Sequence, residues 1–226
     1  MFTRSITQMK KITSSKVLNI RNLTDSTYVL RLEKNDFQFK AGQYLVLDIP
    51  GKFKAREYSI YNSESTPFLD LLIKEVNGGE VSIELKHLQI GTLVEIAGPY
   101  GFFVLRETPK PEAIQYIFIA TGTGISPFHS IILSNPNLDY QIIHGVKTSD
   151  EAYDRSDYLS DRYTLCTTRD NGGDFHGRVT QYLRQREIEK DSIYYICGNS
   201  EMVNEVTEIL EQNGITSKNI RTEIFF

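Results

Sequence analysis

The sequence predicts two domains of different fold class: an N-terminal antiparallel six-stranded β-barrel and a C-terminal α/β domain with a mostly parallel sheet. Residues 12–105 contain short β-rich runs separated by turn residues, as small barrels do. Residues 107–111 hold two prolines beside charged residues, a composition typical of a stiff connector. Beyond them, β-type runs alternate with helical segments, which favours a parallel sheet. We therefore expect one domain at residues 1–108 and the other at 109–226.

The first domain contains six runs rich in Val, Ile, Leu, Tyr or Thr, the residues that favour β-strands. They are residues 15–23, 28–32, 43–49, 55–61, 68–76 and 92–97. Turn-forming residues such as Pro50-Gly51 stand between them. Residues 80–88 interrupt the series, because their apolar side chains predict a short helix.

The second domain has its own set of β-type runs, at residues 114–120, 140–146, 163–168 and 193–197, with a closing strand at 219–226. Its clearest helix covers residues 200–213. One stripe of that helix is apolar, from Met202 to Leu210, and Gly214 stands at its C-terminal end.

The composition is that of a soluble globular protein. Of the 226 residues, 40% are hydrophobic and 24% are charged, and no apolar run approaches the ~18 residues of a membrane span. Two cysteines, Cys166 and Cys197, are too few for a disulfide scaffold or a four-cysteine metal site, which favours a reducing, cytoplasmic compartment. The four histidines follow no metal-ligand spacing, so we expect no metal centre.

Charge is unevenly distributed along the chain. The net charge of −4 argues against nucleic acid as a partner. Residues 1–60 hold 11 Lys or Arg against 5 Asp or Glu, whereas residues 61–226 hold 14 against 24. A basic first domain can steer an acidic partner protein toward it, although two ordinary solvated surfaces explain the difference equally well.

Two small-residue turns follow strands of the second domain. The first is Thr121-Gly122-Thr123-Gly124-Ile125-Ser126-Pro127, where backbone N–H groups and a helix N-terminus can bind phosphate. We expect Ser126 to cap that helix and Pro127 to begin it. A plain tight turn is an equal alternative for this segment taken alone. The second turn, at residues 197–202, should open on the same edge of a parallel sheet, which favours a ligand site there.

The stretch Arg56-Glu57-Tyr58-Ser59 lies in a predicted strand. Side chains two apart on a strand share a face, so Arg56 and Tyr58 combine a guanidinium with an aromatic plane. A ligand that is flat at one end and anionic at the other would use both. The alternative is that Tyr58 fills the barrel and Arg56 is a solvated charge.

Six motifs in order carry a resemblance to a known family. They are Arg56-x-Tyr58-Ser59, Gly79-x-x-Ser82-x-x-Leu85, Gly98-Pro99-x-Gly101-x-Phe103, Thr121-Gly122-Thr123-Gly124-x-x-Pro127, Cys197-Gly198-x-x-x-Met202 and Glu223-x-Phe225. Together they span nearly the whole chain, which resembles the ferredoxin–NADP reductase superfamily and most closely its short bacterial ferredoxin/flavodoxin reductases.

This resemblance implies an FAD site on the first domain. Tyr58 would stack on the flavin, Arg56 would hold the pyrophosphate, and Ser59 would face the flavin N5 edge. Because strand alternation turns Ser59 away from Tyr58, the strand must twist or end there. Further FAD contacts are expected at Ile73, Lys74, Val76, Gly79, Val81 and Ser82, the last of which can also be a simple helix cap. Phe225 would cover the second flavin face, and Phe226 would reach toward the adenine.

The same resemblance implies an NADP(H) site on the second domain. Its residues are Thr121, Gly122, Thr123, Gly124 and Pro127 around phosphate, with Cys197, Gly198 and Met202 in the second turn. Cys197 and Glu223 would flank the nicotinamide; Cys197 serves packing and polarity rather than nucleophilic attack, since no histidine is near it in sequence. Glu223 either holds a proton near the flavin or is an ordinary strand-end carboxylate.

Nucleotide preference depends on cations for a 2′-phosphate. Lys147, Arg169 and Arg178 stand at matching places, but Asp150, Glu151 and Asp170 lie close in sequence and acids can favour NADH instead. We expect NADPH to be preferred.

The function implied is electron transfer from NADPH through FAD to a separate small redox protein, an acidic ferredoxin or flavodoxin. Two alternatives stay open. The chain can be the reductase subunit of a multicomponent oxygenase or similar system, or an FAD-binding redox sensor without turnover.

Overall fold

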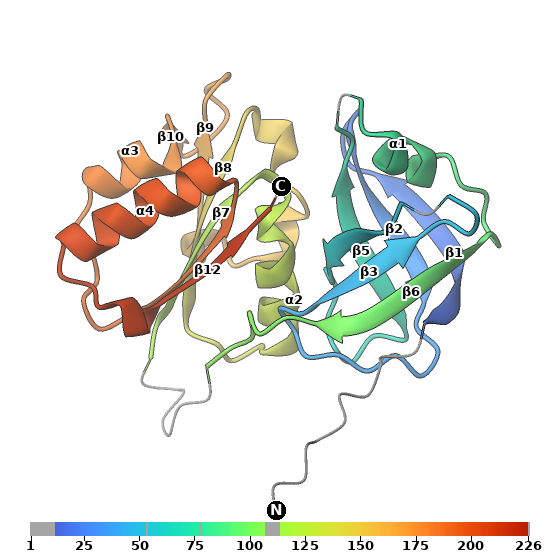
Figure 1. Ribbon diagram of the computed structural model, residues 1–226. Helices are drawn as coiled ribbons and strands as arrows, with labels where there is room; N and C mark the ends of the chain where they lie inside the picture. The colour runs from blue at the N-terminus through green and yellow to red at the C-terminus, as the bar shows by residue number, and fades with distance from the viewer. Residues whose placement is uncertain (1–11, 53, 77, 107–113, 226) are drawn as a thin grey trace, which may run out of the picture.

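The computed structural model describes residues 12–52, 54–76, 78–106 and 114–225, and it confirms the predicted fold class (Figure 1). The first six strands form an antiparallel sheet in the order β4-β3-β6-β1-β2-β5. A bridge between Ile60 and Leu71 joins the chain after β4 to β5 and so closes the barrel. The strands are β1 (Thr13–Asn22), β2 (Thr27–Glu33), β3 (Tyr44–Asp48), β4 (Arg56–Ser59), β5 (Phe68–Lys74) and β6 (Leu93–Tyr100).

Alternating burial shows why these segments are strands. Along β3, Leu45 and Leu47 are fully buried while their neighbours are half-buried, as expected for a strand with one face on a core. Helix α1 (Glu80–Lys86) lies at one end of the barrel and is two residues shorter than predicted. It ends because His87 leaves helical geometry: the His87 N–H donates to the Glu84 carbonyl and the Leu88 N–H to the Leu85 carbonyl.

The second sheet is parallel throughout, in the order β10-β9-β8-β7-β11-β12. Its strands are β7 (Tyr116–Thr121), β8 (Tyr140–Val146), β9 (Tyr163–Thr167), β10 (Phe175–His176), β11 (Ile193–Gly198) and β12 (Ile220–Ile224). The sequence did not predict β10, whose two residues are too few to show a pattern. Helices α3 (Val179–Arg184) and α4 (Ser200–Gln212) cover one face, and α2 (Ser126–Ser134) lies between the sheet and the barrel (Figure 1).

One hydrophobic core continues from the parallel sheet through α2 into the barrel. It joins Phe118 of β7 and Phe128 of α2 to Tyr61, Leu72 and Phe103 of the first domain. The predicted boundary between residues 108 and 109 lies outside the described residues and stays a prediction. Within the described part of the chain, no helix is long and apolar enough to cross a membrane.

Candidate functional site

The carboxyl ends of the parallel strands open toward the barrel end that carries α1. The C-terminus lies between the two domains, in the upper part of Figure 1. In open parallel sheets this edge is the usual ligand-binding edge. The two glycine turns and β4 can therefore serve one site.

The two turns are in direct contact. A Cβ atom on Gly124 would stand 2.4 Å from the Cys197 carbonyl oxygen, and one on Gly198 would stand 2.1 Å from Thr121 Oγ1. Both positions therefore require glycine, because a side chain would collide with the facing segment. Asn199 Nδ2 adds a hydrogen bond to Thr121 Oγ1 at 3.3 Å.

The start of α2 differs from the prediction. Residues Gly122–Ile125 form a 3₁₀ turn that leads directly into the helix, so Ile125 is the N-cap and Ser126 the first helical residue. Ser126 Oγ donates to the Thr123 carbonyl at 2.8 Å instead of capping, and Pro127 follows it. In the second turn, Asn199 does cap α4 by accepting the Met202 N–H at 2.9 Å.

Strand β4 presents Arg56 and Tyr58 together and turns Ser59 away. Tyr58 packs against the barrel core, and burial raises the pKa of its hydroxyl to about 12, with the nearby Arg56 charge opposing that rise. Arg56 is exposed and donates only to the Ala55 carbonyl, at 2.9 Å, among the described residues. The strand ends at Ser59, in accordance with the expectation of a twist or an end there. A flat ligand with a phosphate tail fits this pair.

Ser59, Glu223 and Cys197 come together where the domains meet. Ser59 Oγ donates to Glu223 Oε1 at 3.2 Å, and Glu223 pairs with Cys197 between β12 and β11. Burial raises the Glu223 pKa to about 7, the Ser59 hydrogen bond lowers it, and Glu57 raises it. The carboxyl can therefore hold or release a proton near neutral pH. Burial also raises the pKa of the Cys197 thiol, so it stays protonated and is a packing group rather than a nucleophile.

The turn between β5 and α1 is closed by Ser82. Its Oγ accepts the Val76 N–H and donates to the Gly79 carbonyl, both at 3.2 Å, and is no N-cap. A Cβ on Gly79 would stand 2.9 Å from the Val76 carbonyl oxygen, so glycine is needed there. Of the other predicted flavin contacts in this region, Ile73 and Val81 are buried, Val76 is largely exposed, and Lys74 forms an ion pair with Glu151 of the second domain.

The three candidate cations do not lie together. Lys147 and Arg169 line a cavity of about 280 Å³ between the domains, together with Lys74, Asp150 and Glu151. Arg178 does not line it: this residue caps α3, and its Nη1 lies 3.5 Å from the exposed Glu201. The structure thus places Lys147 and Arg169 together and Arg178 apart from them.

Two of the neighbouring acids are engaged by the protein itself. Asp170 accepts the N–H and hydroxyl of Ser149 at 2.7 and 2.9 Å, and the Gly172 N–H at 3.2 Å, contacts that lower its pKa. Glu151 accepts the Lys147 N–H at 2.9 Å in addition to pairing with Lys74. Of these two carboxylates only Glu151 lines the cavity, and its oxygens already have protein donors.

The end of the chain is attached to the second turn. The Phe225 N–H donates to the Gly198 carbonyl at 2.8 Å, and the half-buried Phe225 side chain packs against the core shared by both domains. Phe226 lies outside the described residues, so its predicted contact stays a prediction.

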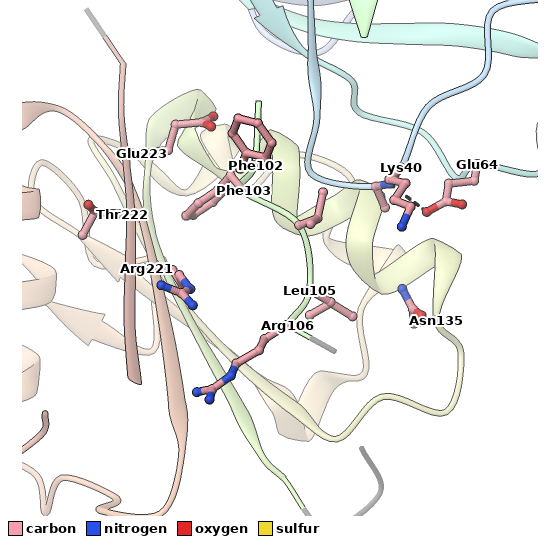
Figure 2. Close-up of a pocket in the computed structure, with 12 residues that line it drawn as sticks. Lys40, Glu64, Phe102, Phe103, Leu105, Arg106, Asn135, Arg221, Thr222 and Glu223 are labelled. Atoms are coloured by element: carbon pink, nitrogen blue, oxygen red, sulfur yellow. Dashed lines mark hydrogen bonds between the residues drawn. The ribbon is translucent and has the colours of Figure 1, made fainter. Parts of the chain in front are cut away.

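A larger cleft of about 770 Å³ opens beside Glu223 (Figure 2). Its walls carry Lys40, Arg106 and Arg221 from both domains, and Phe102, which is 99% exposed, stands next to Glu223. None of these four residues was predicted from the sequence. The one signal in the sequence was the position of Phe102. This aromatic residue follows a glycine turn, where it has no contact with the core.

His129, Asp154 and Asp157 also meet, with ligand atoms within 4.8 Å of one another. Each already has protein partners: His129 contacts the Tyr61 carbonyl at 2.7 Å and Asp157 at 2.9 Å, and Asp154 binds Arg21. The arrangement is a contact between domains and gives no reason to expect a metal.

Comparisons with known proteins agree with this architecture. Residues 14–105 match the oxidoreductase FAD-binding domain, and residues 118–208 match the oxidoreductase NAD-binding domain. The chain is 30% identical over 217 residues to the flavodoxin/ferredoxin–NADP reductase of Escherichia coli, covering 85% of this chain and 87% of that protein.

Other relatives and a solved structure extend the comparison. The toluate 1,2-dioxygenase electron transfer component of Pseudomonas putida is 29% identical over 92% of this chain, which spans 66% of that longer protein. A ferredoxin–NADP⁺ reductase structure from Neisseria gonorrhoeae, with bound FAD and NADP, superposes with a TM-score of 0.83 at 25% identity, covering 96% of this chain and 99% of that one.

Proposed function

Because this chain belongs to the ferredoxin–NADP reductase superfamily of FAD-dependent NAD(P)H oxidoreductases, we propose that it passes electrons from NADPH to a separate acidic ferredoxin or flavodoxin. The observation that carries the proposal is the contact between Ser59 and Glu223. It joins the strand suited to a flavin with the strand next to the two glycine turns. A reaction between two cofactors requires such a junction.

On the first domain, we assign Tyr58 to the flavin ring and Arg56 to the pyrophosphate. FAD, when bound, supplies the hydride and single-electron chemistry that amino-acid side chains lack. The protein contributes position and proton control. Ser59 orients the Glu223 carboxyl, whose pKa of about 7 lets it hold a proton where both domains meet.

On the second domain, we assign the turn at Thr121–Gly124 to the dinucleotide phosphates and Cys197 to the nicotinamide side. We infer a preference for NADPH from Lys147 and Arg169. They line one cavity together with Asp150 and Glu151, and the Glu151 carboxylate is already engaged. Arg178 lies apart from that pair and is not needed for the preference.

The acceptor assignment rests on the cleft beside Glu223. Three cationic side chains on its walls outnumber the two acidic ones, Glu64 and Glu223, which favours an acidic partner, and the exposed Phe102 offers an apolar contact at the same edge. The name of the Escherichia coli relative supports ferredoxin or flavodoxin. We place the protein in the cytoplasm, where both buried cysteines would stay reduced.

A second function has its own support. Relatives named as a dioxygenase electron transfer component and a monooxygenase reductase component match 92% and 88% of this chain, which spans 66% and 60% of their length. In that case the acceptor would be a dedicated oxygenase partner instead of a general ferredoxin. Transfer to ferredoxin and flavodoxin that is far slower than reduction of the protein's own flavin would favour this alternative.

The decisive experiment is an anaerobic titration of the FAD-loaded protein with NADPH and, separately, NADH, followed at the flavin absorbance. We expect bleaching by both, with NADPH effective at the lower concentration. In Lys147→Ala, we expect the difference between the two nucleotides to shrink by about tenfold, the effect of losing one charge-assisted phosphate contact. A flavin that neither nucleotide reduces would contradict the proposed reaction and favour a redox sensor.

The partner is tested by ionic strength. We expect electron transfer to an acidic ferredoxin to slow as salt rises, and Arg221→Glu to slow it further at low salt. Arg184→Glu, on the exposed side of α3, is the matched control and should change little. Transfer rates that do not respond to salt would show that the partner is not steered by charge.

A further inference from the structure

A buried histidine lies directly behind the first glycine turn. His144 of β8 has no exposed surface, and its two ring nitrogens have different partners. Nε2 lies 2.9 Å from the Gly122 carbonyl oxygen, and Nδ1 lies 2.7 Å from the Tyr163 hydroxyl. None of the steps assigned so far uses this chain of groups.

The partners fix the positions of the protons. A carbonyl oxygen can only accept, so Nε2 must carry hydrogen and donate it to Gly122. In the neutral ring, Nδ1 is then an acceptor, and the Tyr163 hydroxyl donates to it. Burial lowers the His144 pKa to about 4, against the opposing effects of the Gly122 hydrogen bond and the Glu151 charge, which keeps the ring neutral. One tautomer of His144 therefore gives a hydrogen-bond partner to both ring nitrogens, to the Tyr163 hydroxyl and to the Gly122 carbonyl.

The Gly122 carbonyl in turn sets the direction of the next N–H. In a trans peptide, the C=O of one residue and the N–H of the following residue point in opposite directions. A Gly122 carbonyl held toward His144 inside the sheet directs the Thr123 N–H away from the interior. Gly122 adopts φ +53, in the left-handed region, while no atom lies within 4 Å of a Cβ built on it. Glycine is therefore required here by backbone conformation rather than by space.

We propose that His144 is a positioning residue for the nicotinamide dinucleotide: supported by Tyr163, it holds the Gly122 carbonyl inward and so presents the Thr123 N–H to the phosphates. The inference rests on the proposed function, since it requires the turn at Thr121–Gly124 to be the phosphate-binding turn. The other side of this turn is already fixed, because Gly124 packs against the Cys197 carbonyl. His144 thus holds the peptide between Gly122 and Thr123, while the Ser126 hydroxyl holds the next one through the Thr123 carbonyl.

The test compares nucleotide affinity with turnover in purified, FAD-loaded variants. We expect His144→Phe to raise the KM and Kd for NADPH about tenfold, because the half-buried Gly122 carbonyl loses its side-chain donor. The kcat should change by less than about twofold, since the reacting groups stay in place. His144→Gln should recover to within about threefold of wild type, because the amide keeps one donor for Gly122 and one acceptor for Tyr163.

A second pair of variants covers the case in which His144→Phe does not fold. Tyr163→Phe removes the hydroxyl that fixes the tautomer and should raise the KM about threefold. Tyr158→Phe is its matched control: this ring stacks on Tyr163 at 5.1 Å between centroids, and its buried hydroxyl has no hydrogen-bond partner within the described chain. We expect no change in that control.

If NADPH reduces the wild-type flavin, any of three results would overturn the inference and leave the proposed function intact. They are wild-type affinity in His144→Phe, a His144→Gln variant no better than the Phe variant, and equal losses in Tyr163→Phe and Tyr158→Phe. A wild-type flavin that neither NADPH nor NADH reduces would instead refute the proposed function, and this inference with it.

Discussion

Among the contacts that join the domains, two sets differ in number and in chemistry. The first, here called the clamp, consists of Arg21, Tyr61, His129 and Asp154. The second is the single hydrogen bond between Ser59 and Glu223 beside the open cleft. One set is built to hold the domains together, and the other brings a titrating carboxyl to the site.

The clamp is a dense polar network. Arg21 binds Asp154 through two hydrogen bonds of 2.8 and 2.7 Å, and the Tyr61 hydroxyl adds a third at 3.1 Å. His129 stacks on Tyr61 with ring centroids 3.8 Å apart. Bidentate pairs of this kind fix orientation as well as distance. The clamp, the shared core and the Lys74–Glu151 pair hold the domain arrangement without Glu223. The pKa of Glu223 lies near 7 because the carboxyl is buried.

The largest expected effect follows from breaking the clamp. Asp154→Ala leaves Arg21 and the Tyr61 hydroxyl without their acceptor and should lower the free energy of unfolding by about 2 kcal/mol. For a chain of this size, this corresponds to a fall in Tm of about 4–8 °C by calorimetry. Glu84→Ala, which removes an exposed ion pair with Lys52, is the control and should cost less than about 0.5 kcal/mol. Equal losses in the two variants would mean that the clamp is no stronger than a surface pair.

The next effect should appear in turnover and not in stability. In Glu223→Gln, the amide oxygen still accepts from Ser59, so we expect a Tm within about 2 °C of wild type. The proton that the carboxyl can hold is lost, and kcat with NADPH should fall about tenfold. Stopped-flow reduction of the flavin and calorimetry on one preparation measure both. If Glu223→Gln lost as much stability as Asp154→Ala, the Ser59–Glu223 contact would hold the domains together as the clamp does, and the distinction between them would fail.

The smallest effect concerns pH. The pKa of Glu223 is raised by burial from 4.5 to about 7, so the folded protein binds a proton that the unfolded chain releases between these values. Its contribution to stability is complete below about pH 4.5 and is lost as pH rises through 7. Relative to Glu223→Gln, wild type should lose about 1 kcal/mol over this range, after allowance for partial exposure. Denaturant titrations at pH 4.5, 6 and 8 measure the difference. If the free energy of unfolding of wild type and of Glu223→Gln changed equally with pH, the pKa of Glu223 would not be raised.

Much of the fold could be predicted, since it depends on patterns that are local in sequence. Alternation along β3 and the all-apolar run of β7 identify their strands and their surroundings. The meeting of the two glycine turns was also predictable, because parallel strands place their carboxyl ends on one edge. The start of α2 was not, since the 3₁₀ turn at Gly122–Ile125 supplies the entry to the helix that Ser126 was expected to cap.

Side-chain partners that are distant in sequence were beyond prediction. Arg21 and Asp154 are 133 residues apart, and no local pattern relates them. In the sequence, Lys147, Arg169 and Arg178 are equivalent cations after strands or before a helix. Only the direction of each chain segment in space separates the first two from the third. The link from His144 to Gly122 is hidden for the same reason, because a lone histidine in a strand has no pattern of its own.

The segment between the barrel and the parallel sheet limits where recombination can exchange the two halves of such proteins. The Tyr195 hydroxyl donates to the Val104 carbonyl and accepts the Arg106 N–H, both at 2.9 Å, while the Phe103 ring contacts Phe128 and Tyr195. The last residues of the first half therefore fold onto the second half. A recombination event that joined this barrel to a relative's α/β half would keep the partners of Tyr195 only if the crossover fell before Phe103. The two halves are distinct in architecture, yet the crossover point that allows their exchange lies inside the first half.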